Sequence, residues 1–455
     1  MSICFKHNTA SQSEILHHLQ RVSSAFVQDL SQRVSLEEYS LKLFSLAERE
    51  EAWLENELIG LVAYYINRDT QKAFITNVSV DLKCQNRGVA TKLIGKATDF
   101  SSEKSMKMIS LEVACDENLL NFYTKLGFIV NRKNTNFIEL NKYLSPVVAI
   151  RCTVFNHEPY LRDCLEGFVM QQTNFPFVAI VHDDASTEGS VAIIREYEEK
   201  YPDIIKPIYE TENQYSKHDG SLGRIMSAAI EATGAKYVAM CEGDDYWTDP
   251  LKLQRQVDFM EADSNYSMCT ENSLVVFSDG LSRDFSDANT RDVTMEELLF
   301  VRQFHTSSVL MRASLFSCIN KLDGPKFDTF IWAFMAQHGK VHYENIISSV
   351  YRRGPGITET DKVRWAYLVE TYNNNMYDKL NIPHYIIKKR NKTQVVDCFN
   401  GFLAAKEQKK YKIALDLLIK CFKYDAKFFL KSYVFLNVFC RYKSIKNKIK
   451  QIIKK

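Results

Sequence analysis

The spacing of apolar side chains divides the chain into three parts. In residues 1–60, apolar positions such as Ile15, Leu19 and Val22 recur every three or four residues, which predicts helices. The following part mixes strands and helices. Strands are expected at 58–66, 73–80, 109–113 and 136–140, and helices at about 89–103 and 118–125. Ser145-Pro146 ends this part, because proline and the residue before it disfavour regular structure.

From residue 147 apolar strands alternate with helices. The strands are VVAIRCTVF, FVAIVHDDAS, KPIYE and YVAMCEGDD, and the helices are expected at 158–171, 189–200 and 222–232. This alternation predicts a parallel sheet covered on both faces, which binds ligands beyond the carboxyl ends of its strands. After Gly354-Pro355-Gly356 the pattern is helical to the end. We therefore predict an α/β protein with three domains, at 1–144, 146–358 and 360–455.

Composition agrees with a folded chain of several domains. At 455 residues, with 45% hydrophobic and 25% charged residues, the chain is not of a disordered, collagen-like or coiled-coil class. The net charge of +2 hides an asymmetry, because residues 406–455 carry 15 basic and 3 acidic side chains. That segment has a charge of +12 and the remainder −10, which suggests an anionic partner for the segment.

Cysteine usage and terminal patterns favour a cytoplasmic protein. The 11 cysteines are scattered and never spaced as C-x-x-C, which favours reduced thiols over disulfides or a zinc site. The first residues lack a basic stretch followed by an apolar one, so no signal peptide is expected. The longest uncharged stretch of the basic segment, SYVFLNVFC, is far shorter than the roughly 20 residues that cross a bilayer.

A turn between a predicted strand and helix has the composition of a phosphate cradle. It holds, in order, Gln85, Asn86, Arg87, Gly88, Val89 and Ala90. A glycine and a small alanine let the backbone approach a phosphate, which helix N-terminal amides favour. Taken alone, this could be an ordinary strand-to-helix turn. Further on, Glu112 lies on a strand, and Asn118 and Tyr123 lie on a helix that Gly127-Phe128 closes.

Together these two segments resemble the GCN5-related N-acetyltransferase (GNAT) family over residues 1–143. The resemblance implies an α+β domain that uses acetyl-CoA as co-substrate. In that case residues Gln85 to Ala90 hold the pyrophosphate, the helix with Asn118 borders the cofactor, and the backbone of Val78 and Val80 pairs with the pantetheine arm. Tyr123 would protonate the leaving thiolate, and Glu112 would be the base for an amine. The spacing from Glu112 to Tyr123 is one residue shorter than in a relative that keeps this base, and Ala90 replaces a second glycine.

The second strand–helix region carries polar residues at its strand ends. Thr153 ends one strand, with Asn156 and Glu158 after it, and Asp183 and Asp184 end the next. A third strand ends in Glu242, Asp244 and Asp245. Carboxylates gathered in this way repel one another unless a cation neutralises them, and such hard oxygen ligands suit Mg or Mn.

These motifs resemble family 2 glycosyltransferases of GT-A fold, a Rossmann-like nucleotide-sugar domain, from about 147 to 357. The resemblance implies that Asp183 and Asp184 contact the nucleotide, with Thr153, Asn156 and Glu158 alongside. Asp244 and Asp245 would bind the metal-diphosphate, with Glu242 where many relatives have Asp. Asp328 would deprotonate the acceptor hydroxyl for an inverting transfer. His305 and Arg352 would line the acceptor or diphosphate side, and Arg224 would be a diphosphate-side arginine, although Ile225 stands where an Asn is usual.

Several of these residues have plain structural alternatives. Glu112 could face solvent or pair with a lysine, and Tyr123 could be a core aromatic. Asp328 could be a helix N-cap, and His305 a buried core histidine. The acidic cluster at 242–245 could be a solvated loop.

The basic segment 406–455 alternates lysines with aromatic and aliphatic residues, as amphipathic helices at anionic membrane surfaces do. We expect it to dock on the cytoplasmic face of the membrane. The alternative is a helical subdomain that packs on the transferase. Nucleic acid is not expected, because no recognition motif accompanies the charge.

The sequence thus predicts a bifunctional enzyme of bacterial surface polysaccharide (O-antigen or capsule type) biosynthesis. One domain would acetylate an amine, with an amino sugar as the expected substrate, and the other would move a sugar from a nucleotide donor to a glycan or lipid-linked acceptor. A first alternative is a glycosyltransferase whose GNAT domain only binds. A remote one is a non-catalytic scaffold at the membrane.

Overall fold

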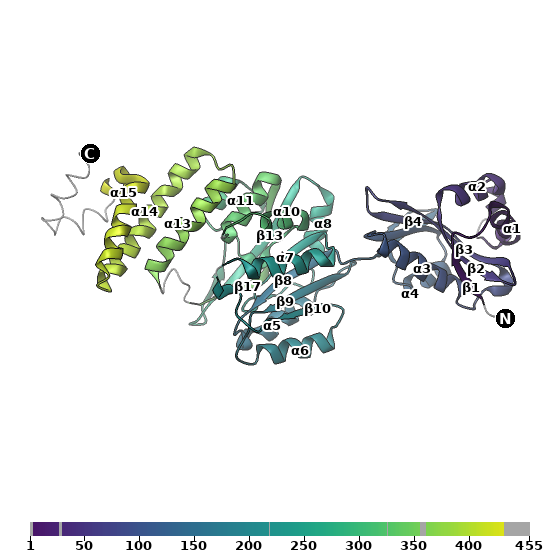
Figure 1. The fold of residues 1–455 in the computed structure, drawn as a ribbon, viewed down its shortest axis with the longest axis horizontal. Helices are drawn as coiled ribbons and strands as arrows, with labels where there is room; N and C mark the ends of the chain where they lie inside the picture. The colour runs from purple at the N-terminus through teal and green to yellow at the C-terminus, as the bar shows by residue number, and fades with distance from the viewer. Residues whose placement is uncertain (1–2, 27–29, 218, 325, 355–360, 432–455) are drawn as a thin grey trace. The chain divides into compact units, whose positions relative to one another are not determined.

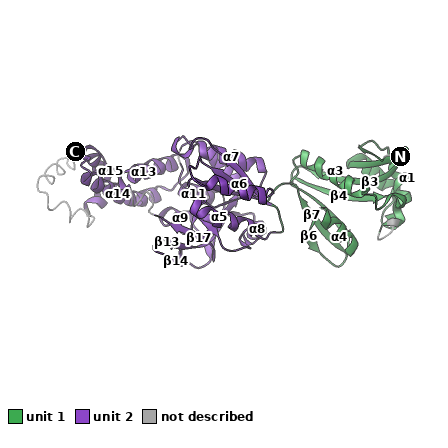
Figure 2. Ribbon diagram, turned by 90° about the horizontal axis from the view of Figure 1, so that it is seen from below, with its two compact units in different colours: residues 1–147, 174–176 green, residues 148–173, 177–455 purple. Residues whose placement is uncertain are grey.

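The structure is a computed structural model that describes residues 3–26, 30–217, 219–324, 326–354 and 361–431. It divides into two compact units (Figures 1 and 2). Unit 1 comprises residues 1–147 with 174–176, and unit 2 comprises residues 148–173 with 177–455. The mixed α/β fold class predicted from the sequence is confirmed.

Unit 1 is built on a seven-stranded sheet of order β1-β2-β3-β4-β5-β7-β6, in which only β4 and β5 run parallel. One face packs on α1 and α2 and the other on α3 and α4. The strands are β1 Cys4–His7, β2 Glu48–Leu54, β3 Glu57–Asn67, β4 Lys72–Val80, β5 Met108–Ala114, β6 Ile129–Lys133 and β7 Phe137–Tyr143. The helices are α1 Gln12–Val22, α2 Leu36–Leu46, α3 Val89–Glu103 and α4 Glu117–Lys125, with short 3₁₀ turns at Ser23–Ala25, Leu30–Gln32 and Leu82–Cys84.

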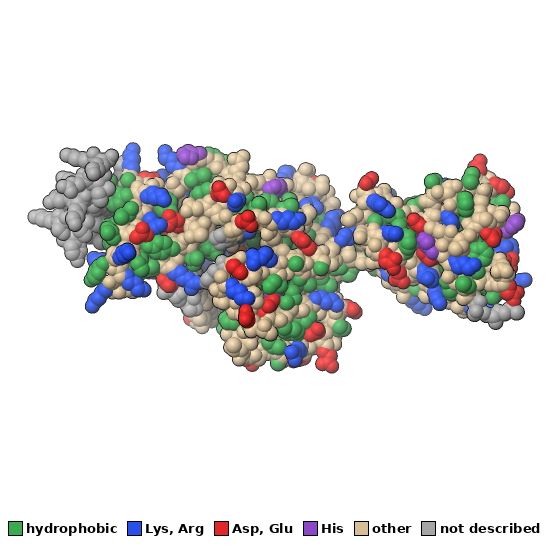
Figure 3. Space-filling view, in the orientation of Figure 1, with side chains coloured by type: hydrophobic (Ala, Val, Ile, Leu, Met, Phe, Trp, Pro, Cys, Tyr) green, Lys and Arg blue, Asp and Glu red, His purple; other side chains and the backbone are tan. Residues whose placement is uncertain are grey.

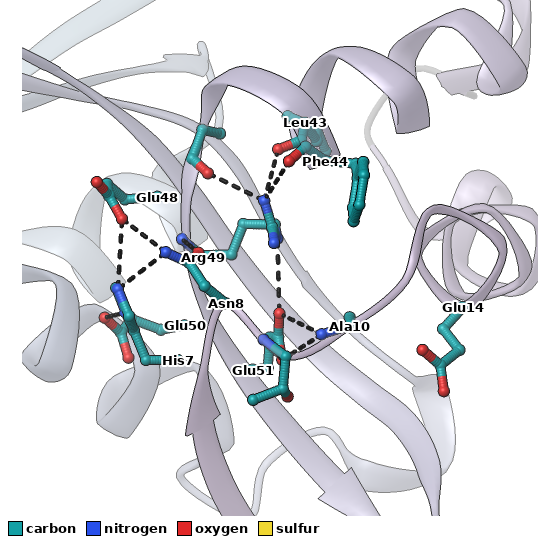
Figure 4. Close-up of polar contacts among 12 residues, drawn as sticks. His7, Asn8, Ala10, Glu14, Leu43, Phe44, Glu48, Arg49, Glu50 and Glu51 are labelled. Atoms are coloured by element: carbon teal, nitrogen blue, oxygen red, sulfur yellow. Dashed lines mark hydrogen bonds and ion pairs between the residues drawn. The ribbon is translucent and has the colours of Figure 1, made fainter.

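The prediction of helices throughout residues 1–60 is wrong in part, because β1, β2 and the start of β3 lie there. Strand β2 escapes the hydrophobic pattern because it buries charge. Glu51 is 0% exposed and accepts a hydrogen bond from the backbone N–H of Ala10 at 3.0 Å (Figure 4). It accepts another from the backbone N–H of Thr9, also at 3.0 Å. Arg49, beside it on β2, donates to carbonyl oxygens at the end of α2. Paired charges of this kind can be buried where isolated ones cannot.

Unit 2 contains a ten-stranded sheet whose main path is β10-β9-β8-β11-β16-β13-β17-β12. Strands β10, β9, β8 and β11 run parallel, as the alternating pattern predicts. The strands are β8 Val148–Val154, β9 Phe177–Asp183, β10 Ile205–Tyr209, β11 Tyr237–Met240, β12 Tyr246–Trp247, β13 Tyr266–Phe277, β14 Ser282–Asp284, β15 Arg291–Val293, β16 Leu310–Arg312 and β17 Lys340–Arg353. The helices that accompany them are α5 Glu158–Val169, α6 Ser190–Lys200, α7 Ser221–Thr233, α8 Lys252–Ala262, α9 Met295–Phe300, α10 Ala313–Asn320 and α11 Asp328–His338, with 3₁₀ turns η4 Tyr215–Lys217 and η5 Thr306–Ser308.

Three long helices follow the sheet and belong to the same unit. They are α13 Lys362–Lys379, α14 His384–Glu407 and α15 Tyr411–Lys431, and they enclose a core of their own around Phe399, Leu417 and Cys421. The first two also join the main core of unit 2 through Met376 and Ile386.

The basic segment predicted at 406–455 is described only in part. Residues 411–431 form α15, whose apolar side packs on the other helices, while residues 432–455 lie outside the described residues. Lys, Arg and hydrophobic side chains share the visible surface of these C-terminal helices (Figure 3). Among the described residues, no helix combines the length and apolar character needed to cross a bilayer.

Candidate active sites

Strands β4 and β5 of unit 1 separate part-way along their length. Their ladder runs from Lys72 opposite Met108 to Ile75 opposite Leu111, and β4 then continues to Val80. A register shift in the pairing of β3 with β4, just after Ile75, accompanies the separation. The backbone of β4 from residue 77 to residue 80 is thus not paired with β5, and it can bind an extended amide chain as an added strand would. Val78 and Val80 lie in this stretch.

The turn after β4 leads into the N-terminus of α3. Asn86 and Gly88 both have positive φ angles, of 59° and 74°, and α3 begins directly after Gly88. No side-chain cap or acidic residue occupies the first turn of this described helix, and a Cβ on Gly88 would meet no atom within 4 Å. The first amides of α3 are therefore open to an anion. The side chains of Gln85, Asn86 and Arg87 are exposed, whereas Val89 is 3% exposed and could bind only through its backbone.

Tyr123 lies on α4, in the core, with its ring 5.7 Å from that of Phe128. Burial raises the pKa of Tyr123 and keeps the phenol protonated, which is the state that a general acid needs. Glu112 is exposed on β5 and faces away from Leu111 and Val113, its neighbours that share the core with Tyr123. The structure thus places Glu112 and Tyr123 on opposite faces of β5. Asn118 is exposed on α4.

In unit 2, two aspartates end β9. Asp184 is 3% exposed, and its carboxylate accepts hydrogen bonds from the backbone N–H of Gln214 at 2.6 Å and of Tyr215 at 3.0 Å. Asp183 accepts from the N–H of Ser186 through one oxygen, while its other oxygen is buried with no hydrogen-bond partner among the described residues. Asp184 therefore holds a loop, and Asp183 has one acceptor oxygen that the described residues leave unused.

The residues that follow β8 hold the surrounding loops together. Asn156 has a φ of 56° and accepts a hydrogen bond from the N–H of Thr187 at 2.9 Å. Glu158 accepts from the N–H of Gly189 at 2.8 Å. The carbonyl of Thr153 accepts from the N–H of Gly243, which ties β8 to the acidic cluster at 242–245. In the structure, these predicted binding residues connect neighbouring loops through hydrogen bonds.

The acidic cluster centres on Asp245, which is 3% exposed. One oxygen accepts a hydrogen bond from the N–H of Arg352 at 3.0 Å, and the other lies 3.4 Å from Nδ1 of His305. Burial, and then the charge of Asp244, raise the pKa of Asp245 well above its usual range. A divalent cation would offset both effects, so the residues fit a metal. Glu242 is half exposed, 3.9 Å from Arg151.

Two further residues surround this cluster. The guanidinium of Arg352 donates to the carbonyl of Asp244 at 2.9 Å, pairs with Asp163 and lies 4.3 Å above the ring of Tyr246. His305 is 6% exposed and stacks on Tyr351 with ring centroids 3.9 Å apart. Burial, helped by the charge of Arg302, lowers the pKa of His305 to about 3, so its imidazole is neutral.

Asp328 is the first residue of α11 and not its N-cap, which is Phe327. Its carboxylate accepts hydrogen bonds from the hydroxyl of Thr306 at 2.7 Å and from Arg302 at 2.9 Å. Thr306 follows His305, which contacts Asp245, so one short segment connects Asp328 to the acidic cluster.

Comparison with known proteins identifies both units. Residues 14–128 match the Acetyltransferase (GNAT) family and residues 151–299 match Glycosyl transferase family 2. The chain joins a GNAT acetyltransferase domain to a family 2 glycosyltransferase domain.

Several known proteins are similar to the glycosyltransferase domain. The uncharacterized protein Rv1520 of Mycobacterium tuberculosis is 38% identical over 160 residues, and the putative glycosyltransferase EpsE of Bacillus subtilis is 32% identical over 130 residues. These alignments cover 35% and 29% of this chain and 44% of each relative, so the chain spans less than half the length of these relatives. The S. aureus TarS 1–349 structure with UDP-GlcNAc covers 62% of this chain and 80% of that one, at 13% identity and a TM-score of 0.43.

The glycosyltransferase domain gathers most, but not all, of its predicted residues. Asp244, Asp245, His305 and Arg352 form one connected group, and Asp328 is bonded to Thr306, the residue after His305. Arg224 is exposed and bonded to Asp219 instead, outside this group. Within the described parts of the chain, no three His, Cys, Asp or Glu side chains converge as a complete metal site.

Sequence reasoning missed Arg302 and Thr306, which hold Asp328. Both flank His305 in the segment VRQFHTSS, but their partner Asp328 lies more than twenty residues further along the chain. The family model ends at residue 299 and does not reach either of them.

Proposed function

We propose that the glycosyltransferase domain transfers a sugar, with inversion, from a nucleotide donor to a hydroxyl group of a glycan or lipid-linked saccharide. The observation that carries this proposal is the pair of consecutive residues His305 and Thr306. His305 contacts the candidate metal ligand Asp245, and Thr306 bonds the candidate base Asp328. One short segment thus links the group that would hold the diphosphate to the group that would activate the acceptor.

The residues have complementary roles in this reaction. Asp183 offers its unpartnered oxygen to the nucleoside, and Asp184 keeps the adjoining loop in place. Asp244 and Asp245, with Glu242 nearby, would hold Mn or Mg, which when bound neutralises the diphosphate leaving group. Arg352 adds positive charge at the same place. Asp328 takes the proton of the acceptor hydroxyl while the new C–O bond forms and the bond from the anomeric carbon to the diphosphate breaks.

Substitution of Asp328 tests this proposal. We expect Asp328→Asn to lower sugar transfer at least about 100-fold, as loss of a general base does. Mn-dependent nucleotide binding, measured by calorimetry, should stay within about twofold. Asp323→Asn, an exposed aspartate of the preceding loop, is the matched control and should keep full activity. Unchanged transfer by Asp328→Asn would disprove the assigned base.

We further propose that the GNAT domain transfers an acetyl group from acetyl-CoA to an amine, with an amino sugar as the substrate class. The unpaired part of β4 and the open N-terminus of α3 support acetyl-CoA binding, and the protonated phenol of Tyr123 suits the thiolate leaving group. Glu112 would deprotonate the amine from the other face of β5, directly or through a water molecule. Fusion of the two domains suggests that they act in one pathway.

Acetyl transfer is tested on the full chain with nucleotide-linked amino sugars, scored by CoA release. We expect activity that Tyr123→Phe reduces at least about tenfold and Glu112→Gln reduces as well. The alternative of a binding-only GNAT domain predicts acetyl-CoA binding without CoA release, and no effect of Tyr123→Phe on the glycan product. A non-catalytic scaffold predicts neither transfer nor Mn-dependent nucleotide binding.

We also propose a place in bacterial surface polysaccharide assembly, at the cytoplasmic face of the membrane. One similar protein carries the name of a putative teichuronic acid biosynthesis glycosyltransferase, TuaG of B. subtilis. Exposed Tyr411, Leu415 and Ile419 recur every four residues along α15, among lysines, which suits an anionic bilayer.

Sedimentation with anionic vesicles tests membrane docking. Deletion of residues 406–455 would remove α15 and expose the core around Leu417 and Cys421, so it cannot separate docking from folding. Deletion of residues 432–455 removes none of the residues described in that core and is the cleaner change. Combined with Leu415→Glu and Ile419→Glu, it should abolish vesicle binding while soluble-acceptor activity persists. Full vesicle binding after these changes would disprove docking through this segment.

A further inference from the structure

Helix α13, outside both matched families, packs directly on the start of α11. The ring of Phe327, the residue before Asp328, lies parallel to the ring of Tyr372 on α13, with centroids 3.5 Å apart and planes at 9°. The indole of Trp365, two turns earlier on α13, is also stacked against Phe327, at 5.6 Å and 25°. Two aromatic side chains of the C-terminal region therefore hold the residue that precedes the candidate base.

The neighbouring backbone is held by the same helix. Phe327 is the N-cap of α11 but makes no side-chain capping hydrogen bond, so its ring contacts fix the entry of the chain into the helix. Three residues earlier, Gly324 has a φ of 93°, and a Cβ there would lie only 2.3 Å from the side chain of Asn375 on α13. The loop before Asp328 is thus packed against α13 at two points.

Helix α13 is itself anchored to the transferase sheet. Its Met376 lies in the main core, and the following α14 is tied to α9 by Lys389 and Tyr385, which bond Glu296 at 3.0 and 3.2 Å. Arg390 of α14 also donates to the carbonyl of Leu299 at the end of α9. The helices behind Phe327 are therefore anchored to the core and to α9, which precedes the segment that leads to Thr306.

We propose that Tyr372 and Trp365 are positioning residues of the glycosyltransferase. By holding Phe327 they place the carboxylate of Asp328 where Thr306 and Arg302 both donate to it. This inference rests on the proposed role of Asp328 as the base. It makes the C-terminal helices part of the acceptor half of the enzyme, in addition to any role in docking.

The test compares two tyrosines of the same helix. Tyr372→Ala should lower kcat for sugar transfer about 10- to 100-fold, since small displacements of a reacting group cost about that much. Donor binding should change less than about twofold, and Tyr372→Phe, which keeps the ring, should restore kcat. The control is Tyr367→Ala, because Tyr367 points to Asp416 on α15, to which its hydroxyl donates at 2.7 Å. Equal kcat values for the Tyr372→Ala and Tyr367→Ala variants would overturn the inference.

Two further variants distinguish positioning of Asp328 from other causes of a lower kcat. In an Asp328→Asn background, Tyr372→Ala should cause no additional loss of transfer, because its effect passes through Asp328. An additional loss there would refute a positioning role. If Tyr372→Ala does not fold, as judged by circular dichroism, Phe327→Leu removes the stack from the other side and is scored in the same way. If Asp328→Asn itself retains activity, the proposed base fails, which is a result distinct from failure of the stack.

Discussion

Acidification should selectively weaken the contact between α1 and strand β4. His18 on α1 is fully buried, with Nδ1 3.0 Å from the carbonyl oxygen of Leu58 and Nε2 2.9 Å from the hydroxyl of Ser79 on β4. Burial, and then the charge of Arg21, lower the pKa of His18 to about 4. The folded protein therefore holds His18 neutral, whereas the unfolded chain protonates it below about pH 6.5.

The size and sign of the effect follow from these two pKa values. Above about pH 6.5 His18 is neutral in both states, and its contribution to stability is complete. As the pH falls, the unfolded state binds a proton that the folded state does not, until the pH reaches about 4. At about 1.4 kcal/mol for each pKa unit, the difference amounts to about 3 kcal/mol lost between pH 7.5 and pH 4.

Hydrogen exchange measured by mass spectrometry on α1 peptides gives the free energy of opening at each pH. The wild-type protein should lose about 3 kcal/mol more than His18→Gln, which keeps hydrogen bonding but does not titrate. His17→Gln, at the exposed neighbouring position, should keep the wild-type pH dependence. Identical pH dependences for wild type and His18→Gln would refute the argument that burial keeps His18 neutral.

Two other changes have clear expected outcomes. Gly167→Ala places a Cβ 2.8 Å from the backbone nitrogen of Trp247, and it should lower stability by about 1–3 kcal/mol in thermal unfolding. Gly95→Ala, where a Cβ meets nothing within 4 Å, should instead be neutral or stabilising. Thr306→Val removes the 2.7 Å hydrogen bond to Asp328, and it should lower kcat for sugar transfer while donor binding is kept. Thr306→Ser, which restores the hydroxyl, should recover most of the activity, and equal kcat values for the Val and Ser variants would contradict a role for this bond.

The sequence predicts elements well where apolar spacing is uninterrupted. The helix expected at 89–103 is α3, Val89–Glu103, and the parallel strands of unit 2 end at the acidic clusters as expected. Strand β2 is missed because Arg49 and Glu51 are buried as an ion pair, whereas a hydrophobic pattern assigns charged residues to the surface. Hydrophobic periodicity indicates which apolar side chains are buried, but it does not indicate which charged side chains are buried with a partner.

The residues of the candidate sites also divide into those that the sequence predicts and those that it misses. Motifs of consecutive residues, such as Asp244 and Asp245, can be read locally because they follow a single strand. The link from Thr306 to Asp328 depends on tertiary packing, and so does the stack of Phe327 on Tyr372. No local pattern marks a threonine or a tyrosine as the partner of a residue in another element.

The stack of Phe327 on α13 also bears on how this enzyme could be recombined with its relatives. The parallel strands and their acidic clusters, up to about residue 299, form the proposed donor side. The proposed acceptor side begins with Arg302 and includes the helices that support Phe327, which themselves share a core with α15. A chimera intended to change the acceptor should therefore exchange residues 300–431 as one block. A crossover between α11 and α13 would pair Phe327 with an unrelated helix and misplace the base, whatever acceptor the new helices had evolved to accompany.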